Sequence, residues 1–406
     1  MNLDLEFVRS QFPALRSDWA FFDNAGGTPP PAAVIESAGD YMRACQVQLG
    51  ASHALSTEAT RRVEQGHFAA ASLLGADPDE VILGASTTIN IFVLAQAFAA
   101  TVRPGDEIIV TDLDHEANIG AWRRLERSGA KIRAWRLRPE TARLELEDLE
   151  TLLSERTRLV CFTHCSNIVG AYHDVAAITQ RVHAAGGLVC VDGVAFAPHR
   201  RVDVKALGVD FYLVSLYKTW GPHLAALYGR RELLRALPGQ NHFFVDEEQV
   251  PYKFQPGSVP HELAAAVPGI IEYLRSVAER LGADPTDLRH ALPRCFEAFM
   301  KHEEALSKRF LDYIVGRRDI RLIGPRVHDA TVRAPIFSFV VNGHSSSEVV
   351  GLLDQQQVAV RHGDFYARRA VDALGIGPSK GVVRVSMMHY NTDRDVDRLI
   401  SALDRV

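Results

Sequence analysis

The chain has 406 residues, more than one hydrophobic core usually serves, so we expect about two domains. Its 47% hydrophobic and 23% charged residues are ordinary for a globular protein, and a net charge of −5 gives no reason to expect nucleic acid or a membrane surface as partner. No apolar run is long enough to span a bilayer and no secretory signal is visible, so we expect a cytoplasmic protein. The cysteines form no Cys-x-x-Cys pair and the histidines no ligand spacing, which argues against disulfides and a metal site.

Short apolar runs alternate with helix-like segments between about residues 79 and 230. We expect strands at 81–83, 107–110, 132–137, 159–162, 188–191, 211–215 and 224–228. Helices are expected at 88–100, 116–127, 174–187 and 231–237. Strands that are apolar on both faces and alternate with helices favour a mostly parallel sheet covered on both sides, which is an α/β architecture.

The pattern changes beyond about residue 285, where strands and helices are fewer. A helix at 294–315 precedes strands at 320–323, 336–341, 358–360 and 382–387, and a helix at 393–403 closes the chain. This order suits a smaller α+β unit. We therefore predict a large domain at 15–280 and a small domain formed by residues 1–14 and 281–406.

Lys218 directly follows the apolar run 211–215, in a chain with seven lysines among 45 basic residues. Guanidinium stays charged, whereas a lysine amine can lose its proton and attack a carbonyl. A lysine at the carboxyl end of a buried strand therefore suggests Schiff-base chemistry. Taken alone, Lys218 also fits a surface lysine at a strand end.

Polar residues end the other predicted strands, where ligands gather in doubly wound sheets. If the ligand is pyridoxal phosphate (PLP), Asp192 can keep its pyridine nitrogen protonated. Ser86 and Thr87 open a helix and offer donors to the phosphate, with Ser215 as a further hydroxyl. His115 could lie flat on the ring. Each alone also fits a cap, turn or loop, but their order along the chain favours a PLP site.

The chain resembles the class V aminotransferases, most closely the branch that contains cysteine desulfurases and selenocysteine lyases. The resemblance runs from Phe22 to the last helix. The motifs that carry it are Gly-Ala-Ser-Thr-Thr-x-Asn from Gly84, Asp-His-Glu-Ala-Asn from Asp114, Thr-His-Cys-Ser-Asn-Ile-Val-Gly from Thr163, Val-Asp-Gly from Val191, Ser-Leu-Tyr-Lys-Thr-Trp-Gly-Pro from Ser215 and Arg-Val-Ser-Met-Met-His-Tyr-Asn-Thr from Arg384. It implies PLP as cofactor and a fold type I transferase: a large domain with a mostly parallel seven-stranded sheet between helices, and a smaller α+β C-terminal domain.

The resemblance also implies a role for each matching residue. Lys218 matches the Schiff-base lysine, Asp192 the partner of the pyridine nitrogen, and His115 the histidine stacked on the ring as an acid/base group. The positions matched to cofactor binding are Lys218, Ser86, Thr87, His115, Asn167, Asp192, Ser215, Tyr217 and Ser258. Ser258 matches a residue that reaches the neighbouring subunit's phosphate, which implies a homodimer with shared active sites. On the substrate side, Arg384 matches the clamp of the α-carboxylate, next to Asn167, and the candidates His53 and Arg361 lie in segments expected to border the site.

Two departures from the family pattern stand out. The stretch Arg361–Ala367 lacks the cysteine that desulfurases carry on this loop, and Tyr366 lies there instead. Without a thiolate, the usual attack on the substrate sulfur has no nucleophile. Cys165 lies on the cofactor side, in the wrong place to take over. Ala195 stands where the family usually has a glutamine.

We therefore predict an enzyme that acts on a small-molecule amino acid through a Lys218 aldimine and a Cα carbanion. A desulfurase-like lyase (β-elimination) or an aminotransferase is favoured, and racemisation stays open. One alternative is a genuine cysteine desulfurase with an unconventional sulfur acceptor. Another is a non-catalytic PLP-binding partner of a sulfur-transfer system.

Overall fold

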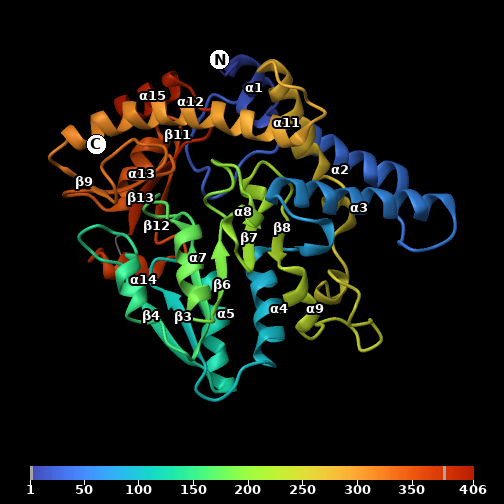
Figure 1. Ribbon diagram of the computed structural model, residues 1–406. Helices are drawn as coiled ribbons and strands as arrows, with labels where there is room; N and C mark the ends of the chain where they lie inside the picture. The colour runs from blue at the N-terminus through green and yellow to red at the C-terminus, as the bar shows by residue number, and fades with distance from the viewer. Residues whose placement is uncertain (1–2, 378–380) are drawn as a thin grey trace.

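A seven-stranded sheet forms the centre of the large part of the molecule (Figure 1). The computed structural model describes residues 3–377 and 381–406. The strand order is β2 (Val81–Gly84), β8 (Ala225–Gly229), β7 (Phe211–Ser215), β6 (Leu188–Asp192), β5 (Thr157–Thr163), β3 (Glu107–Thr111) and β4 (Lys131–Trp135). Strand β8 is antiparallel to both of its neighbours, and the other pairs are parallel. The predicted α/β fold with a mostly parallel seven-stranded sheet is confirmed.

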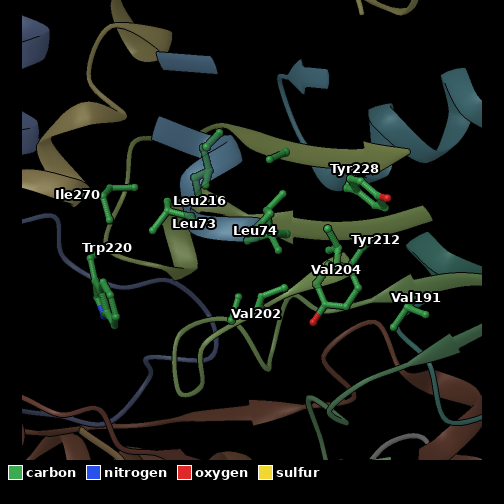
Figure 2. Packing of buried hydrophobic residues seen from close by; sticks show 14 of the residues in the cluster. Leu73, Leu74, Val191, Val202, Val204, Tyr212, Leu216, Trp220, Tyr228 and Ile270 are labelled. Carbon is green, nitrogen blue, oxygen red and sulfur yellow. The ribbon is translucent and has the colours of Figure 1, made fainter. Parts of the chain in front are cut away.

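Helices cover both faces of this sheet because its strands are apolar on both sides. Helices α4 (Thr87–Ala99) and α5 (Ala117–Arg123) pack on one face. Helices α3 (Ala54–Leu74) and α7 (Val175–Ala184) pack on the other, where Leu74 and Val204 lie beside Tyr212 (Figure 2). Helix α11 (Pro268–Arg280) packs against α3 in the same core. The remaining helices of this part are α1 (Leu5–Ser10), α2 (Ala32–Cys45), α6 (Leu146–Glu150), α8 (Val204–Leu207), α9 (Arg231–Ala236) and α10 (His261–Ala264).

A second, smaller core surrounds an antiparallel sheet. Its order is β12 (Arg361–Gly363), β13 (Val382–Ser386), β10 (Ile336–Val341) and β9 (Ile320–Ile323), and β1 (Ala20–Phe21) pairs in parallel with β11 (Val358–Ala359). The helices of this part are α12 (Leu288–Gly316), α13 (Ser346–Asp354), α14 (Arg368–Ala373) and α15 (Asp393–Leu403). Helix α12 begins against the large core and ends against the small one, so it bridges the two. The division into a large domain at 15–280 and a small domain formed by 1–14 and 281–406 stays a prediction, and residues 1–2 and 378–380 of that small domain lie outside the described residues.

Several element boundaries differ from the expectation. The start expected at 294 for the long helix is wrong, because α12 begins at Leu288 and contains Pro293. Asp287 caps this helix by accepting a hydrogen bond from the Arg289 N–H at 3.0 Å. A proline removes only one N–H donor, and the packed helix tolerates that loss. Strand β12 was not expected at all, since its three residues are polar or glycine. Among the described residues we find no helix with the length and apolarity that crossing a membrane requires.

Candidate active site

Lys218 ends a short turn that follows β7, and the core beneath the turn fixes its position. The hydroxyl of Thr28 donates to the Tyr217 carbonyl at 3.2 Å and accepts the Trp220 N–H at 2.9 Å. Trp220 is fully buried, in the same packing cluster as Leu216 and Ile270 (Figure 2). The turn is therefore held both by hydrogen bonds and by packing, which leaves the lysine amine little freedom to move away.

The surroundings of Lys218 favour a neutral amine. Burial, then the positive charge of Arg384, lowers the pKa of Lys218 to about 8, although the Asp192 carboxylate acts in the opposite direction. A neutral amine is the form that attacks a carbonyl. At pH 8 about half of such amines are neutral, whereas an ordinary lysine is almost fully charged.

One cavity gathers most of the predicted cofactor-binding residues, although they come from separate elements. Its lining includes Ser86, Thr87, His115, Asn167, Asp192, Ser215, Tyr217 and Lys218. The strands that carry them end at the same edge of the parallel sheet, which explains why residues up to 132 positions apart meet here.

The start of α4 forms one end of this cavity and suits a phosphate. Ser86 caps the helix by accepting the Ile89 N–H at 3.2 Å, and the hydroxyls of Thr87 and Ser215 lie 2.7 Å apart. The positive end of a 13-residue helix and free backbone N–H groups favour an anion at this position. Gly84 lets the Asn90 side chain lie against the end of β2, since a Cβ atom there would lie 1.9 Å from the Asn90 side-chain oxygen.

Asp192 lies deep in the cavity at the end of β6. Its Oδ1 atom accepts the Val194 N–H at 2.9 Å. Burial raises the pKa of Asp192, whereas the Val194 N–H and the nearby Lys218 lower it. A protonated pyridine nitrogen would supply the cationic partner that a buried carboxylate needs. With Lys218 and the start of α4 in the same cavity, the residues present fit PLP.

His115 borders the cavity from the turn after β3. Its Nδ1 atom accepts the Ala117 N–H at 3.1 Å, so the neutral ring carries its proton on Nε2. Burial, followed by the charges of Lys218 and Arg384, lowers the pKa of His115 to about 4. The imidazole is therefore neutral at physiological pH and can take up a proton only against these charges.

Four predicted site residues do not line this cavity. Arg384 is only 2% exposed and bonds Asp23 and the Asn167 carbonyl. The other three are Ser258, which lines a separate cavity beside α3, His53, which is exposed and caps α3, and Arg361, which pairs with Asp23 at 3.0 Å. Among the lining residues, Val194 and His223 were not predicted from the sequence. The position of His223, five residues after Lys218, was the available signal. For Asp23, which pairs with Arg384, the sequence contains no such signal, because only the fold brings the two residues together.

Residues 20–399 match the family model described as "Aminotransferase class-V". The chain belongs to this family. It is 38% identical to the aminotransferase-like protein FGM3 of Gibberella zeae, over 100% of this chain and 99% of that protein. It is 34% identical to the cysteine desulfurase-like protein ustD of Aspergillus flavus, over 100% and 91%. The structure of the cysteine desulfurase CsdA of Escherichia coli superposes with a TM-score of 0.85 at 27% identity, over 100% of this chain and 98% of that chain.

Family membership makes the chain a PLP-dependent enzyme of the desulfurase-like lyase or aminotransferase kind, acting on amino acids. The predicted resemblance and the predicted cofactor are thereby confirmed. The roles of individual residues, the bond that is broken and the partner subunit stay predictions.

Proposed function

We propose that the protein is a PLP-dependent β-elimination lyase whose reaction is carried by Lys218. The observation that supports this proposal best is the position of Lys218, Asp192 and the hydroxyls of Thr87 and Ser215 around one cavity. When bound, PLP supplies a pyridinium ring that withdraws electrons from the substrate Cα. The Asp192 carboxylate holds the proton on the pyridine nitrogen, and the start of α4 binds the phosphate.

Arg384 and Lys218 act on the substrate in this proposal. Arg384 binds the α-carboxylate, for which a guanidinium offers two parallel hydrogen bonds. The amine of Lys218 then removes the proton from Cα, and the electron pair of that bond expels the leaving group from Cβ. A substrate carboxylate at Arg384 would offset the charge that lowers the Lys218 pKa, so binding would make this base stronger.

The cysteines give little support to the alternative of a genuine desulfurase. All five are buried, and the loop at 361–367 contains none. Cys165 lines the cavity, but burial raises the pKa of its thiol well above the ordinary value. Its thiol lies 3.6 Å from the Gly170 carbonyl, to which it donates. A protonated, hydrogen-bonded thiol is a poor nucleophile, so an external thiol would have to accept the sulfur.

We also propose a homodimer with shared active sites. The segment that carries Ser258 is tied to β2 by Gln255, whose amide donates to the Leu83 carbonyl at 3.0 Å. Ser258 therefore lies near the phosphate end of the sheet, yet outside its own cavity. Aromatic side chains that line the same cavity as Ser258 are exposed, among them Phe68 at 58% and Tyr252 at 42%. A second copy covering this surface would bury them and bring Ser258 to the other subunit's phosphate.

Product identification tests the proposed reaction. We expect L-cysteine or β-chloro-L-alanine to give pyruvate, ammonia and the leaving group. A 2-oxo acid that keeps the side chain would instead establish transamination, and the opposite enantiomer would establish racemisation. Alanine formed from L-cysteine with added dithiothreitol as sulfur acceptor would establish desulfuration. Absence of any visible cofactor band in protein purified with PLP would overturn the proposal as a whole.

A further inference from the structure

The guanidinium of Arg384 is closed off from the cavity that it is proposed to serve. Its side chain is 2% exposed, and it is absent from the residues that line the cavity. One Nη atom donates to the Asn167 carbonyl at 3.2 Å and the other to Asp23 at 3.2 Å. Its Nε atom is buried and has no hydrogen-bond partner within the described part of the chain. One nitrogen of the guanidinium, Nε, is thus left without a partner, although the group itself is covered.

Phe365 provides the cover. Its ring lies over the Arg384 guanidinium, with 3.7 Å between the guanidinium carbon and the ring centroid. The Asn167 amide donates to the Phe365 carbonyl at 3.0 Å. The next residue, Tyr366, is held through its carbonyl by the Glu116 N–H at 2.7 Å. The loop therefore lies across the substrate side of the site, fixed at its two aromatic residues.

The backbone of this loop adopts a conformation that aromatic residues rarely take. Phe365 has φ = 51° and Tyr366 has φ = 59°, both in the left-handed region. Two successive non-glycine residues there store strain that a change of loop conformation would release. The Tyr366 side chain is 74% exposed and its ring lies 5.2 Å from the His115 ring, between centroids, so a movement at that residue gives up this ring contact and little buried surface.

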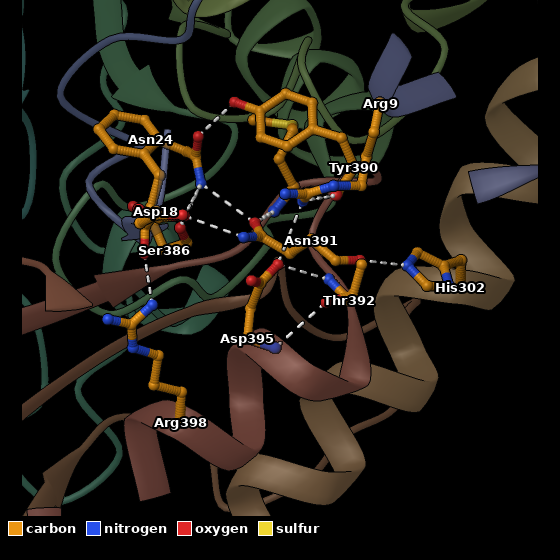
Figure 3. A network of polar contacts seen from close by, with 12 residues as sticks. Arg9, Asp18, Asn24, His302, Ser386, Tyr390, Asn391, Thr392, Asp395 and Arg398 are labelled. Carbon is orange, nitrogen blue, oxygen red and sulfur yellow. Dashed lines mark hydrogen bonds and ion pairs between the residues drawn. The ribbon is translucent and has the colours of Figure 1, made fainter. Parts of the chain in front are cut away.

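Asp23 provides the second closing contact. One carboxylate oxygen accepts from Arg384 and the other lies 3.0 Å from Arg361 Nε. Asp23 comes from the N-terminal segment, which a polar network fixes to the end of β13. In that network Asn24 donates to the Ser386 carbonyl at 2.7 Å and is joined to Tyr390 and Asn391 (Figure 3). The carboxylate of Asp23 is thus held at the Arg384 guanidinium.

We propose that Phe365 and Asp23 control the access of the substrate carboxylate to Arg384. The α-carboxylate takes over the contact that Asp23 makes with Arg384, while Asp23 keeps its contact with Arg361. Phe365 moves off the guanidinium to admit the carboxylate and exposes the Nε donor, which completes a two-pronged contact. The inference rests on the proposed role of Arg384 as the carboxylate anchor, and it makes the two residues positioning residues.

Labelling with phenylglyoxal, an arginine-selective reagent, tests the cover on the PLP-loaded protein. We expect Arg384 to react about tenfold more slowly than the 59% exposed Arg361, with peptide mass spectrometry as the readout. Phe365→Ala should bring the two rates together, and Phe365→Leu should give an intermediate rate. The matched control Tyr366→Ala removes the neighbouring aromatic ring and should leave the Arg384 rate unchanged. Equal rates in the wild-type protein, or no change in Phe365→Ala and Phe365→Leu, would overturn the inference.

Protection by acetate tests the role of Asp23. In the Phe365→Ala background, Asp23→Asn should lower the acetate concentration that half-protects Arg384 by about fivefold, because a charged internal competitor is lost. Asp18→Asn removes an exposed charge from the same segment and should leave that concentration unchanged. An unchanged or higher concentration for Asp23→Asn would contradict the proposal.

These readouts do not depend on turnover. If the visible cofactor band is missing, the proposed function fails, and the same labelling of the protein as purified still tests whether Phe365 and Asp23 cover Arg384. If the band and the products are as proposed but Arg384 reacts freely, only the inference fails.

Discussion

The proposed cofactor side and the proposed substrate side of the site are built differently. The cofactor side comes from the ends of neighbouring strands and from the start of α4, all fixed by the large core. The substrate side depends on contacts between distant segments, such as Arg384 with Asp23, 361 positions earlier. The first arrangement is rigid before any ligand arrives. The second contains a strained loop and an internal carboxylate, so it can rearrange when the substrate binds.

The charge of Arg384 links the two sides electrostatically. After burial, its charge is the largest cause of the low pKa of Lys218, and it also lowers the pKa of His115. If a substrate carboxylate neutralised the charge of Arg384, the pKa of Lys218, the proposed base, would therefore rise. The comparison predicts that changes on the cofactor side abolish chemistry, whereas changes on the substrate side alter binding and pH dependence.

Lys218→Ala should have the largest effect. We expect loss of the visible band of lysine-bound cofactor and a decrease in kcat of about 1000-fold or more, because both the attachment and the base are lost. Absorbance spectra and product assays measure the two effects. Lys301→Ala, at an exposed lysine paired with Glu297 on α12, is the matched control and should behave like the wild type. Retention of the band in Lys218→Ala would contradict the proposed site.

Asp192→Asn should come next, since it keeps the shape of the side chain and removes its charge. We expect kcat to fall by about 100-fold while the cofactor stays attached, because the pyridine nitrogen loses its anionic partner. Steady-state kinetics and the cofactor spectrum separate the two effects. Unchanged kcat would show that Asp192 does not act on the ring.

Arg384→Lys should act mainly on substrate binding, in contrast to the changes at Lys218 and Asp192, which should act on kcat. We expect KM for the amino acid to rise about 30-fold with a smaller change in kcat, because an ammonium group cannot offer two parallel hydrogen bonds. Arg361→Lys changes the neighbouring arginine, which already pairs with Asp23, and should raise KM less. A larger rise in KM for Arg361→Lys than for Arg384→Lys would indicate that Arg361, and not Arg384, binds the substrate carboxylate.

The sequence predicts the cofactor side better than the substrate side for a physical reason. Lys218, Asp192 and Thr87 each lie one to four residues after an apolar run, and parallel strands bring such positions to one edge. Phe365 and Asp23 have no such signal, since their contacts depend on how the N-terminal segment and β12 meet β13. Strand β12 could not be predicted for the same reason. Its residues have no apolar strand pattern, and only their pairing with β13 makes them a strand.

The smallest expected effect concerns pH. Because burial and Arg384 lower the Lys218 pKa, the rate at which cofactor-free protein captures PLP should rise with pH, with a midpoint near pH 8, and level off above about pH 9. Arg384→Gln removes a charge that lowers this pKa, so the midpoint should move to higher pH. Asp192→Asn removes a charge that raises it, so the midpoint should move to lower pH. Stopped-flow absorbance over pH 6–10 gives the midpoints, and shifts of the opposite sign would refute the assigned causes.

The most direct test of the central claim is to trap the cofactor on its lysine. Borohydride reduction of the PLP-loaded protein, followed by peptide mass spectrometry, identifies the modified residue. The account predicts modification of Lys218 in stoichiometric yield, and of none of the other lysines beyond trace levels. Modification mainly at a different lysine, with Lys218 unmodified, would contradict it.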